Sequence, residues 1–143
     1  MGLVNTYQTY TFKEGDSRTI CYKTDEKMST RDYESLFEDS NVKSVVIPEG
    51  VTMIPNYCFM YCYDLETVTI PSTVKHIEKQ AFDNCTNLTN ITSLATTPPE
   101  CTGTDVFVNI PSTCKVYVPA ESISAYKAAS QWSAFGNRIQ AIP

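Results

Sequence analysis

The sequence has 143 residues and a mass of 16.0 kDa, which suits one domain or a short array of repeats but not two full-sized domains. With 42 % hydrophobic and 19 % charged residues, the composition is that of a folded chain. The net charge of -5 argues against nucleic acid or an anionic membrane as a partner, because phosphates are bound by basic groups. No apolar run is long enough to predict a membrane insertion, and the first dozen residues do not predict a secretory signal.

The N-terminal segment, residues 1–41, has a pattern of its own. Two stretches rich in Tyr and Thr, residues 3–12 and 18–23, flank the turn sequence Glu-Gly-Asp-Ser and predict a β-hairpin. Ser29 or Thr30 then suits the start of a short helix. We expect this segment to form an N-terminal cap.

The next region, residues 42–119, repeats a unit of about 23 residues. Residues 42–48, Val-Lys-Ser-Val-Val-Ile-Pro, align with residues 65–71, Leu-Glu-Thr-Val-Thr-Ile-Pro, so that the apolar positions coincide. The third unit departs from the pattern at 93–99, and a degenerate fourth strand at 115–119 again ends in apolar-x-apolar-Pro. This period and spacing are typical of leucine-rich repeats, whose units stack because none buries its apolar side alone.

Each unit predicts a short strand, a bend at Ile-Pro, a second extended piece and one helical turn. The inward-pointing residues are Val42, Val45, Ile47, Val51, Ile54, Cys58, Phe59 and Cys62 in the first unit, and Leu65, Val68, Ile70, Val74, Ile77, Ala81, Phe82 and Cys85 in the second. Cys58 aligns with Ala81 and Cys62 with Cys85, which favours reduced, buried thiols for these three cysteines over a disulfide or a redox site. Whether Cys101 and Cys114 pair is left open.

The C-terminal segment, residues 120–143, predicts a helical cap. Pro119 precedes a stretch with apolar residues at helical spacing, and Gly136 follows it, so we expect one helix over 120–135. Its apolar stripe consists of Ile123, Tyr126, Ala129, Trp132 and Phe135. A stack of repeats needs such covers because each end exposes an apolar layer and open strand edges.

Four motifs occur together in a recognisable order. They are Ile-Pro-x-x-Val-x-x-Ile, then Ala-Phe-Asp-Asn-Cys-Thr-Asn-Leu-Thr at 81–89, Ala-Thr-Thr-Pro-Pro at 95–99, and Val-Tyr-Val-Pro-Ala-Glu-Ser-Ile-Ser-Ala-Tyr-Lys-Ala-Ala at 116–129. Over roughly residues 42–142 the chain resembles the BspA-like leucine-rich-repeat proteins. The resemblance implies an α/β solenoid of short parallel strands and helical turns. It also implies a bacterial protein, secreted or at the cell surface, that acts in adhesion by binding host proteins or other cells.

The sequence does not predict an enzyme. His76 is the sole histidine, and it lies between two inward-pointing residues where its side chain would face solvent. No dinucleotide, phosphate-loop or esterase motif is present, and the acidic residues form no glycosidase-like pair. We therefore expect no catalytic residue, no cofactor and no metal, and a hydrolase is the weakest interpretation.

The residues between the inward positions predict columns along an exposed face. The first column consists of Ser44, Thr67, Asn90 and Lys115, and the second of Val46, Thr69, Thr92 and Tyr117. All of these except Lys115 are candidate partner-binding residues. A third column consists of Lys43, Glu66 and Thr89. Hydroxyl and amide groups on a flat ladder suit hydrogen bonding to a peptide or a glycan. The alternative is a solvated sheet, because Thr is also a good strand former.

A second candidate surface lies in the first helical turn. Its members are Tyr57, Met60, Tyr61 and Tyr63, whereas the next unit carries polar residues at the matching positions. Exposed aromatic residues and Met are enriched at binding sites. The alternative is that the N-terminal cap covers this patch.

We thus predict a non-catalytic binding module, a monomer or weak homodimer, for a protein or glycan on a host or neighbouring cell. The alternative is a structural spacer or a self-association module of a larger surface or fibre protein. Ligand, compartment and oligomeric state are left open by the sequence.

Overall fold

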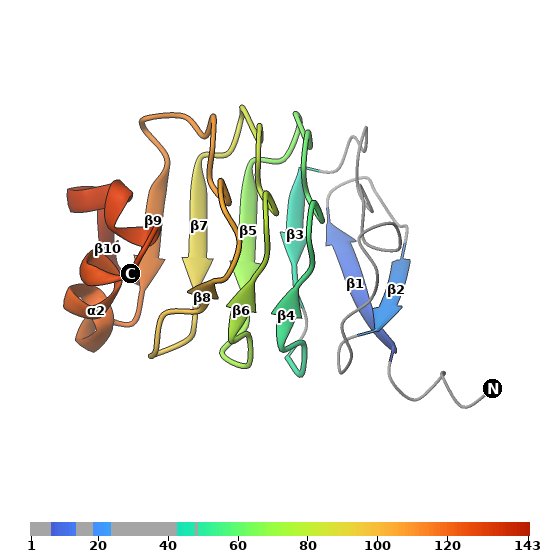
Figure 1. The fold of residues 1–143 in the computed structure, drawn as a ribbon, viewed down its shortest axis with the longest axis horizontal. Coiled ribbons are helices and arrows are strands. Elements are labelled where there is room, and N and C mark those ends of the chain that lie inside the picture. The colour runs from blue at the N-terminus through green and yellow to red at the C-terminus, as the bar shows by residue number, and fades with distance from the viewer. Residues whose placement is uncertain (1–6, 14–18, 24–42, 48) are drawn as a thin grey trace.

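The computed structural model describes residues 7–13, 19–23, 43–47 and 49–143, and Figure 1 shows their arrangement as a row of stacked turns. A larger, seven-stranded sheet has the order β10-β9-β7-β5-β3-β1-β2, and a smaller, three-stranded sheet has the order β4-β6-β8. The strands are β1 (Tyr7–Lys13), β2 (Thr19–Lys23), β3 (Ser44–Val46), β4 (Met53–Ile54), β5 (Thr67–Ile70), β6 (His76–Ile77), β7 (Asn90–Ser93), β8 (Glu100–Cys101), β9 (Lys115–Val118) and β10 (Ile139–Ala141).

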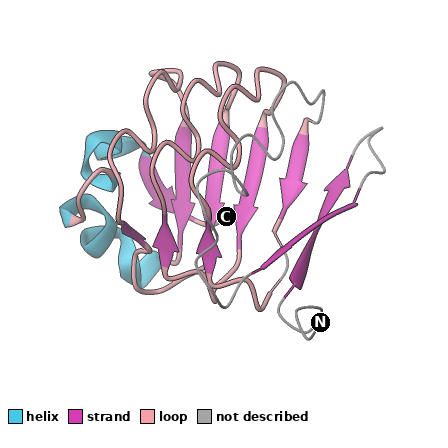
Figure 2. Cartoon of the chain, turned by 45° about the vertical axis from the view of Figure 1, so that its right-hand side comes forward, coloured by secondary structure: helices cyan, strands magenta, loops and turns pink. Residues whose placement is uncertain are grey.

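Successive repeats add parallel strands to both sheets, which confirms the α/β leucine-rich-repeat solenoid. In the larger sheet Val45 pairs with Val68, and Val68 with Ile91, so the 23-residue shift of the sequence is the register of the sheet. Figure 2 shows the two sheets facing each other, and the helices of the described residues all lie at one end.

The core between the sheets follows the predicted inward pattern. Every predicted inward residue that the structure describes is buried, and Val42 lies outside the described residues. The rings of Phe59 and Phe82 stack at 5.2 Å between centroids, and those of Phe82 and Phe107 at 5.9 Å. Interplanar angles of 9° and 8° make this a continuous aromatic column through three repeats.

The N-terminal hairpin is confirmed where the structure describes it. Strands β1 and β2 pair antiparallel and cover the described part of the two predicted stretches, of which residues 3–6 and 18 lie outside the described residues. Strand β1 also pairs antiparallel with β3, so the hairpin extends the larger sheet beyond the first repeat. The predicted turn and the helix starting at Ser29 or Thr30 lie outside the described residues.

The third repeat is complete, although its sequence leaves the pattern. His76 pairs with Glu100, a shift of 24, and Phe82 stacks on Phe107, a shift of 25. Two single-residue insertions therefore hide the repeat from a fixed-period alignment. At Gly103 an added Cβ would lie 2.4 Å from the Cα of Lys79, so the inserted chain passes where only glycine fits.

The predicted single helix over 120–135 is wrong, because the cap consists of three short pieces. They are η2 (Ala120–Ser122), α2 (Ile123–Ala128) and η3 (Trp132–Arg138), the last of which is kinked at Gly136, and the chain then adds β10 parallel to β9. The break falls at Gln131, which has a left-handed φ of 68°. The predicted apolar stripe is still turned to the core: Tyr126, Trp132 and Phe135 are buried, and Ile123 and Ala129 pack against the core as partly buried residues.

At the C-terminal end of the stack, a side chain of the cap makes a hydrogen bond that the backbone of a following repeat would otherwise make. Within the repeats, Lys75 N donates to Thr52 O at 2.8 Å and Glu100 N to Lys75 O at 2.8 Å. Pro99 occupies the next equivalent position, and its carbonyl accepts from Trp132 Nε1 at 2.9 Å. The cap thus satisfies a carbonyl that the end of the stack would otherwise leave open.

Candidate interaction surfaces

The predicted columns exist on the outer face of the larger sheet. Ser44 pairs with Thr67 and Thr67 with Asn90, which pairs with Lys115. In the second column, Val46 pairs with Thr69, Thr69 with Thr92, and Thr92 with Tyr117 on neighbouring strands. These side chains are half-buried or exposed, while the alternating residues Val45, Val68, Ile91 and Val116 are buried. The structure therefore brings the predicted face together across four strands.

The hydroxyl groups on this face differ in their partners. Thr67 Oγ1 donates to Ser44 Oγ at 2.9 Å, and Thr89 Oγ1 donates to the carbonyl of Glu66 at 2.9 Å. No described residue forms a side-chain hydrogen bond with Thr69 or Thr92. Their hydroxyls lie side by side on β5 and β7 and are available to donate and accept.

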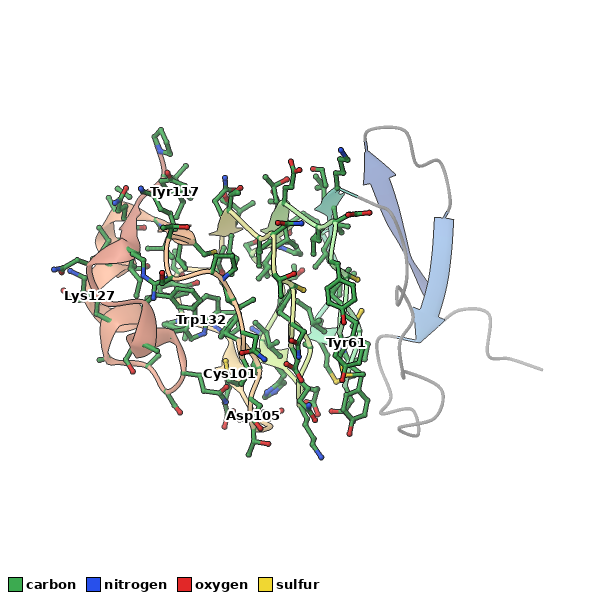
Figure 3. The ribbon with its side chains drawn as sticks, turned by 90° about the horizontal axis from the view of Figure 1, so that it is seen from above. Tyr61, Cys101, Asp105, Tyr117, Lys127 and Trp132 are labelled. Carbon is green, nitrogen blue, oxygen red and sulfur yellow. The ribbon has the colours of Figure 1, made fainter. Side chains whose placement is uncertain are left out.

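The aromatic patch of Tyr57, Met60, Tyr61 and Tyr63 lies in the turn after β4. The rings of Tyr61 and Tyr63 stack at 6.0 Å, and Tyr63 is 49 % exposed. The ammonium group of Lys79 lies 5.8 Å from the centre of the Tyr57 ring. Figure 3 places Tyr61 toward the end of the stack that carries the hairpin. The alternative, in which the N-terminal hairpin and helix cover this patch, depends on the side chains of β1 and β2 and on residues 24–42, which lie outside the described part of the chain.

Two tyrosines of the patch have left-handed backbones. Tyr57 has a φ of 61°, and its equivalents Gln80 and Asp105 have similar values of 52° and 58°. Tyr61 has a φ of 62°, and its equivalents are Asn84 and Asn109 at 63° and 59°. Asn and Asp tolerate this conformation, whereas bulky residues adopt it at a cost. The repeat imposes the geometry, and the first repeat fills it with aromatic residues.

The cysteines are structural where the structure describes their side chains. Disulfide bonds do not involve Cys58, Cys62, Cys85, Cys101 or Cys114, so Cys101 and Cys114 do not pair. Burial raises the pKa of the Cys85 thiol well above its usual value. Burial also raises the pKa of Cys101 to about 12 and that of Cys114 to about 11. Few thiolates form at neutral pH, which does not suit nucleophilic chemistry.

The polar residues of the described chain do not assemble a reaction centre. His76 is 47 % exposed, and its Nδ1 lies 3.6 Å from a carboxylate oxygen of Glu100. No group of three or more potential metal ligands occurs among the described residues. Within the same part of the chain, no helix has the length and hydrophobicity to cross a bilayer.

The comparison with family models identifies the repeats. The model for a BspA-type leucine-rich-repeat region matches residues 30–130, in six copies. The chain belongs to the BspA-type leucine-rich-repeat family. No curated protein matches the sequence. Membership of this family indicates a protein-interaction module, and BspA-type and other leucine-rich repeats are generally non-catalytic.

Sequence reasoning missed one feature of this BspA-type protein. Two adjoining hollows of about 500 and 510 Å³ lie on the surface where the third repeat meets the C-terminal cap, and both include Cys101 and Ser130 in their lining. No sequence signal predicts them, because they depend on the break in the cap helix and on the insertion at Gly103.

Proposed function

We propose that this protein is a non-catalytic, adhesin-like module, secreted or held at a cell surface, that binds a protein or glycan on a host or neighbouring cell. The contact surface is the outer face of the larger sheet. The observation that carries the proposal is the pair of in-register columns, with the hydroxyls of Thr69 and Thr92 adjacent and without side-chain partners among the described residues.

The chemistry of this face suits polar recognition. Each hydroxyl both donates and accepts a hydrogen bond, so one pair serves the alternating polar groups of a peptide backbone or of a sugar. Tyr117 continues the column on β9 and adds an aromatic surface at its end. Because the strands are held by backbone ladders and a packed core, the face is pre-organised and loses little conformational entropy on binding.

A binding screen with matched variants tests this proposal. The purified chain is applied to matrix proteins, mucins and glycans, beside Thr69→Lys and the control Thr86→Lys. Both substitutions introduce the same side chain, but Thr86 lies exposed in a turn outside the columns. We expect saturable binding that Thr69→Lys weakens by about 10-fold or more at an unchanged melting temperature, while Thr86→Lys binds as the unchanged chain does. Equal binding by both variants would contradict the proposal.

A second candidate is self-association, favoured by the half-exposed Tyr61–Tyr63 pair. In that case the module is a spacer or assembly element of a larger surface or fibre protein. Sedimentation measurements separate the two functions: a dimer that Tyr61→Asn converts to a monomer supports assembly. A monomer at every concentration, with Tyr61→Asn unchanged, contradicts it. Asn is the informative replacement because Asn84 and Asn109 occupy the equivalent positions.

A further inference from the structure

The smaller sheet ends at β8, whereas the larger sheet is extended at the same end of the stack. In the larger sheet β10 occupies the position beyond β9. In the smaller sheet β8 pairs with β6, and no described strand pairs with its outer side. After β9 the chain forms the cap helices (Figure 1), and no further described strand joins the smaller sheet at this edge.

The main-chain groups of Cys101 point to that open side. Glu100 N donates to Lys75 O at 2.8 Å, and Thr102 N donates to Ile77 O at 3.0 Å. Successive residues of a strand direct their groups to opposite sides, so the N–H and C=O of Cys101 face away from β6. The equivalent carbonyl of Ile54 accepts from Glu78 N at 2.9 Å. Cys101 therefore presents the donor and acceptor that a further strand would pair with.

The cap satisfies the positions on either side of Cys101 but leaves this residue open. Trp132 Nε1 donates to Pro99 O at 2.9 Å, and Gln131 Nε2 donates to Gly103 O at 2.6 Å. Gln131 Oε1 also accepts from Val106 N at 2.9 Å. These contacts hold the cap against the third repeat. The main-chain groups of Cys101 lie between the contact at Pro99 and the contact at Gly103.

A groove lies along this edge, formed by the two adjoining hollows. The first, of about 500 Å³, has Pro98–Cys101 on one wall and Ala125, Ala128, Ala129 and Ser130 on the other. The second, of about 510 Å³, continues past Cys101 toward Asp105. Both hollows are open to solvent along their length, which suits an extended chain better than an enclosed small molecule. Figure 3 shows Cys101 and Asp105 on the side of the molecule opposite Tyr117, so the groove is separate from the columns.

The charge of the groove selects its ligand. Glu100 and Asp105 are the charged side chains of the lining, and both are acidic. The Glu100 side chain is 71 % exposed, with His76 at 3.6 Å on its β6 side. No Lys or Arg is among the lining residues. A ligand with a basic side chain would therefore be favoured over a neutral or acidic one.

We propose that the groove binds an extended segment of a partner protein as an added strand of the smaller sheet. The segment pairs its backbone with Cys101, directs small apolar side chains toward the alanine wall, and places a Lys or Arg beside Glu100 or Asp105. Strand addition of this kind derives affinity from main-chain hydrogen bonds and specificity from the flanking side chains. This surface lies outside the sheet face assigned above, so either proposal can fail without the other.

Amide NMR spectra with short peptides as probes test the inference. The probe is a positional-scanning library of capped peptides with one fixed Lys, and the best binder is remade with alternate backbone amides methylated. We expect saturable shifts at the amides of Cys101, Ala128 and Ser130 with the plain peptide, and none with the methylated one. Absence of saturable shifts at these amides across the library, or equal shifts with the methylated peptide, would overturn the proposal.

Two variants locate the binding. Ala128→Trp fills the groove from an exposed position, and Ala120→Trp introduces the same side chain outside its lining. We expect the first to weaken the best peptide by about 10-fold or more and the second to leave it unchanged. The pair Glu100→Gln and Asp105→Asn is expected to weaken a Lys peptide but not its norleucine analogue. Equal affinity of all variants for the Lys peptide would contradict the assignment.

Discussion

Asn109 Nδ2 donates to Asn84 Oδ1 at 3.1 Å, although the two residues are 25 positions apart. Both have a left-handed φ near 60°, the conformation that Tyr61 adopts in the first repeat. The second and third repeats therefore carry an asparagine at this position, whereas the first repeat carries Tyr61. The repeat thus imposes a left-handed backbone at this position, and Tyr61 adopts it although that conformation favours Asn over Tyr.

Replacing Tyr61 by Asn tests the conformational cost. A left-handed residue costs roughly 1–2 kcal/mol unless it is Gly, Asn or Asp. Loss of the ring pair with Tyr63 costs about 0.5–1.5 kcal/mol. We therefore expect Tyr61→Asn to be close to neutral in urea unfolding, and Tyr63→Asn, which loses the same ring pair without a backbone gain, to be less stable by about 1 kcal/mol. Equal losses for the two variants would show that the backbone contributes nothing.

Trp132→Phe tests the closure of the stack by the cap. The substitution removes the donor to Pro99 O and leaves a buried carbonyl without its partner. We expect a loss of about 1–3 kcal/mol in the free energy of unfolding, in addition to the effect of the smaller ring. Circular dichroism with urea is the suitable measurement, because Trp132 is the sole tryptophan and its fluorescence is lost in the variant. An unchanged midpoint would contradict the role given to the indole N–H.

Gly103→Ala tests the insertion in the third repeat. Its Cβ would clash with the Cα, N and Cβ of Lys79, and the two main-chain atoms cannot move aside at little cost. Such overpacking typically costs about 1–3 kcal/mol or more. The neighbouring change Thr104→Ala, at an exposed position, is expected to stay within about 0.5 kcal/mol of the unchanged protein. A tolerated Gly103→Ala would mean that the loop lies farther from Lys79 than the structure has it.

Tyr126 gives the fold a dependence on alkaline pH. Its hydroxyl bonds with Ser93 Oγ at 2.8 Å and donates to Ala95 O at 2.7 Å, and burial raises its pKa to about 12 from an ordinary value of 10. The folded state thus holds the proton more tightly, so stability falls as pH rises from about 10 to about 12. Tyr126→Phe should be less stable near neutral pH and should lose less stability across that window. A parallel decline of both proteins would remove Tyr126 as a cause.

The thiols offer a test of the packed core. In a Cys21→Ser background, which removes the cysteine whose side chain lies outside the described residues, we expect thiol reagents to react slowly at neutral pH. Burial and the raised pKa of Cys101 and Cys114 both oppose thiolate attack. All five remaining thiols should react once the chain is unfolded. Rapid reaction of Cys58, Cys62, Cys85 or Cys114 in the folded protein would contradict their burial.

The sequence alone predicts the repeats and the polar columns because both follow from a period that one chain displays. Matching Val45 to Val68 sets the register, and the register then aligns Thr69 with Thr92. The third repeat is hidden because its insertions change the period from 23 to 24 and then to 25.

The end of the stack depends on tertiary contacts that no local pattern encodes. Apolar spacing predicts a continuous helix over 120–135, but Gln131 breaks it at a left-handed φ while its amide bonds to Gly103 O and Val106 N. These partners lie more than 20 residues away in the chain. The groove beside Cys101 follows from that break, so it was beyond sequence reasoning as well.

The central claim is that the outer face of the larger sheet contacts the partner. The most direct measurement is the affinity of Thr69→Lys, Thr92→Lys and Thr86→Lys for the ligand found in the screen, together with their melting temperatures. The account predicts an affinity loss of about 10-fold or more for the first two, none for the third, and one melting temperature for all. Retained affinity in both sheet variants, at unchanged melting temperature, would show that the partner binds elsewhere.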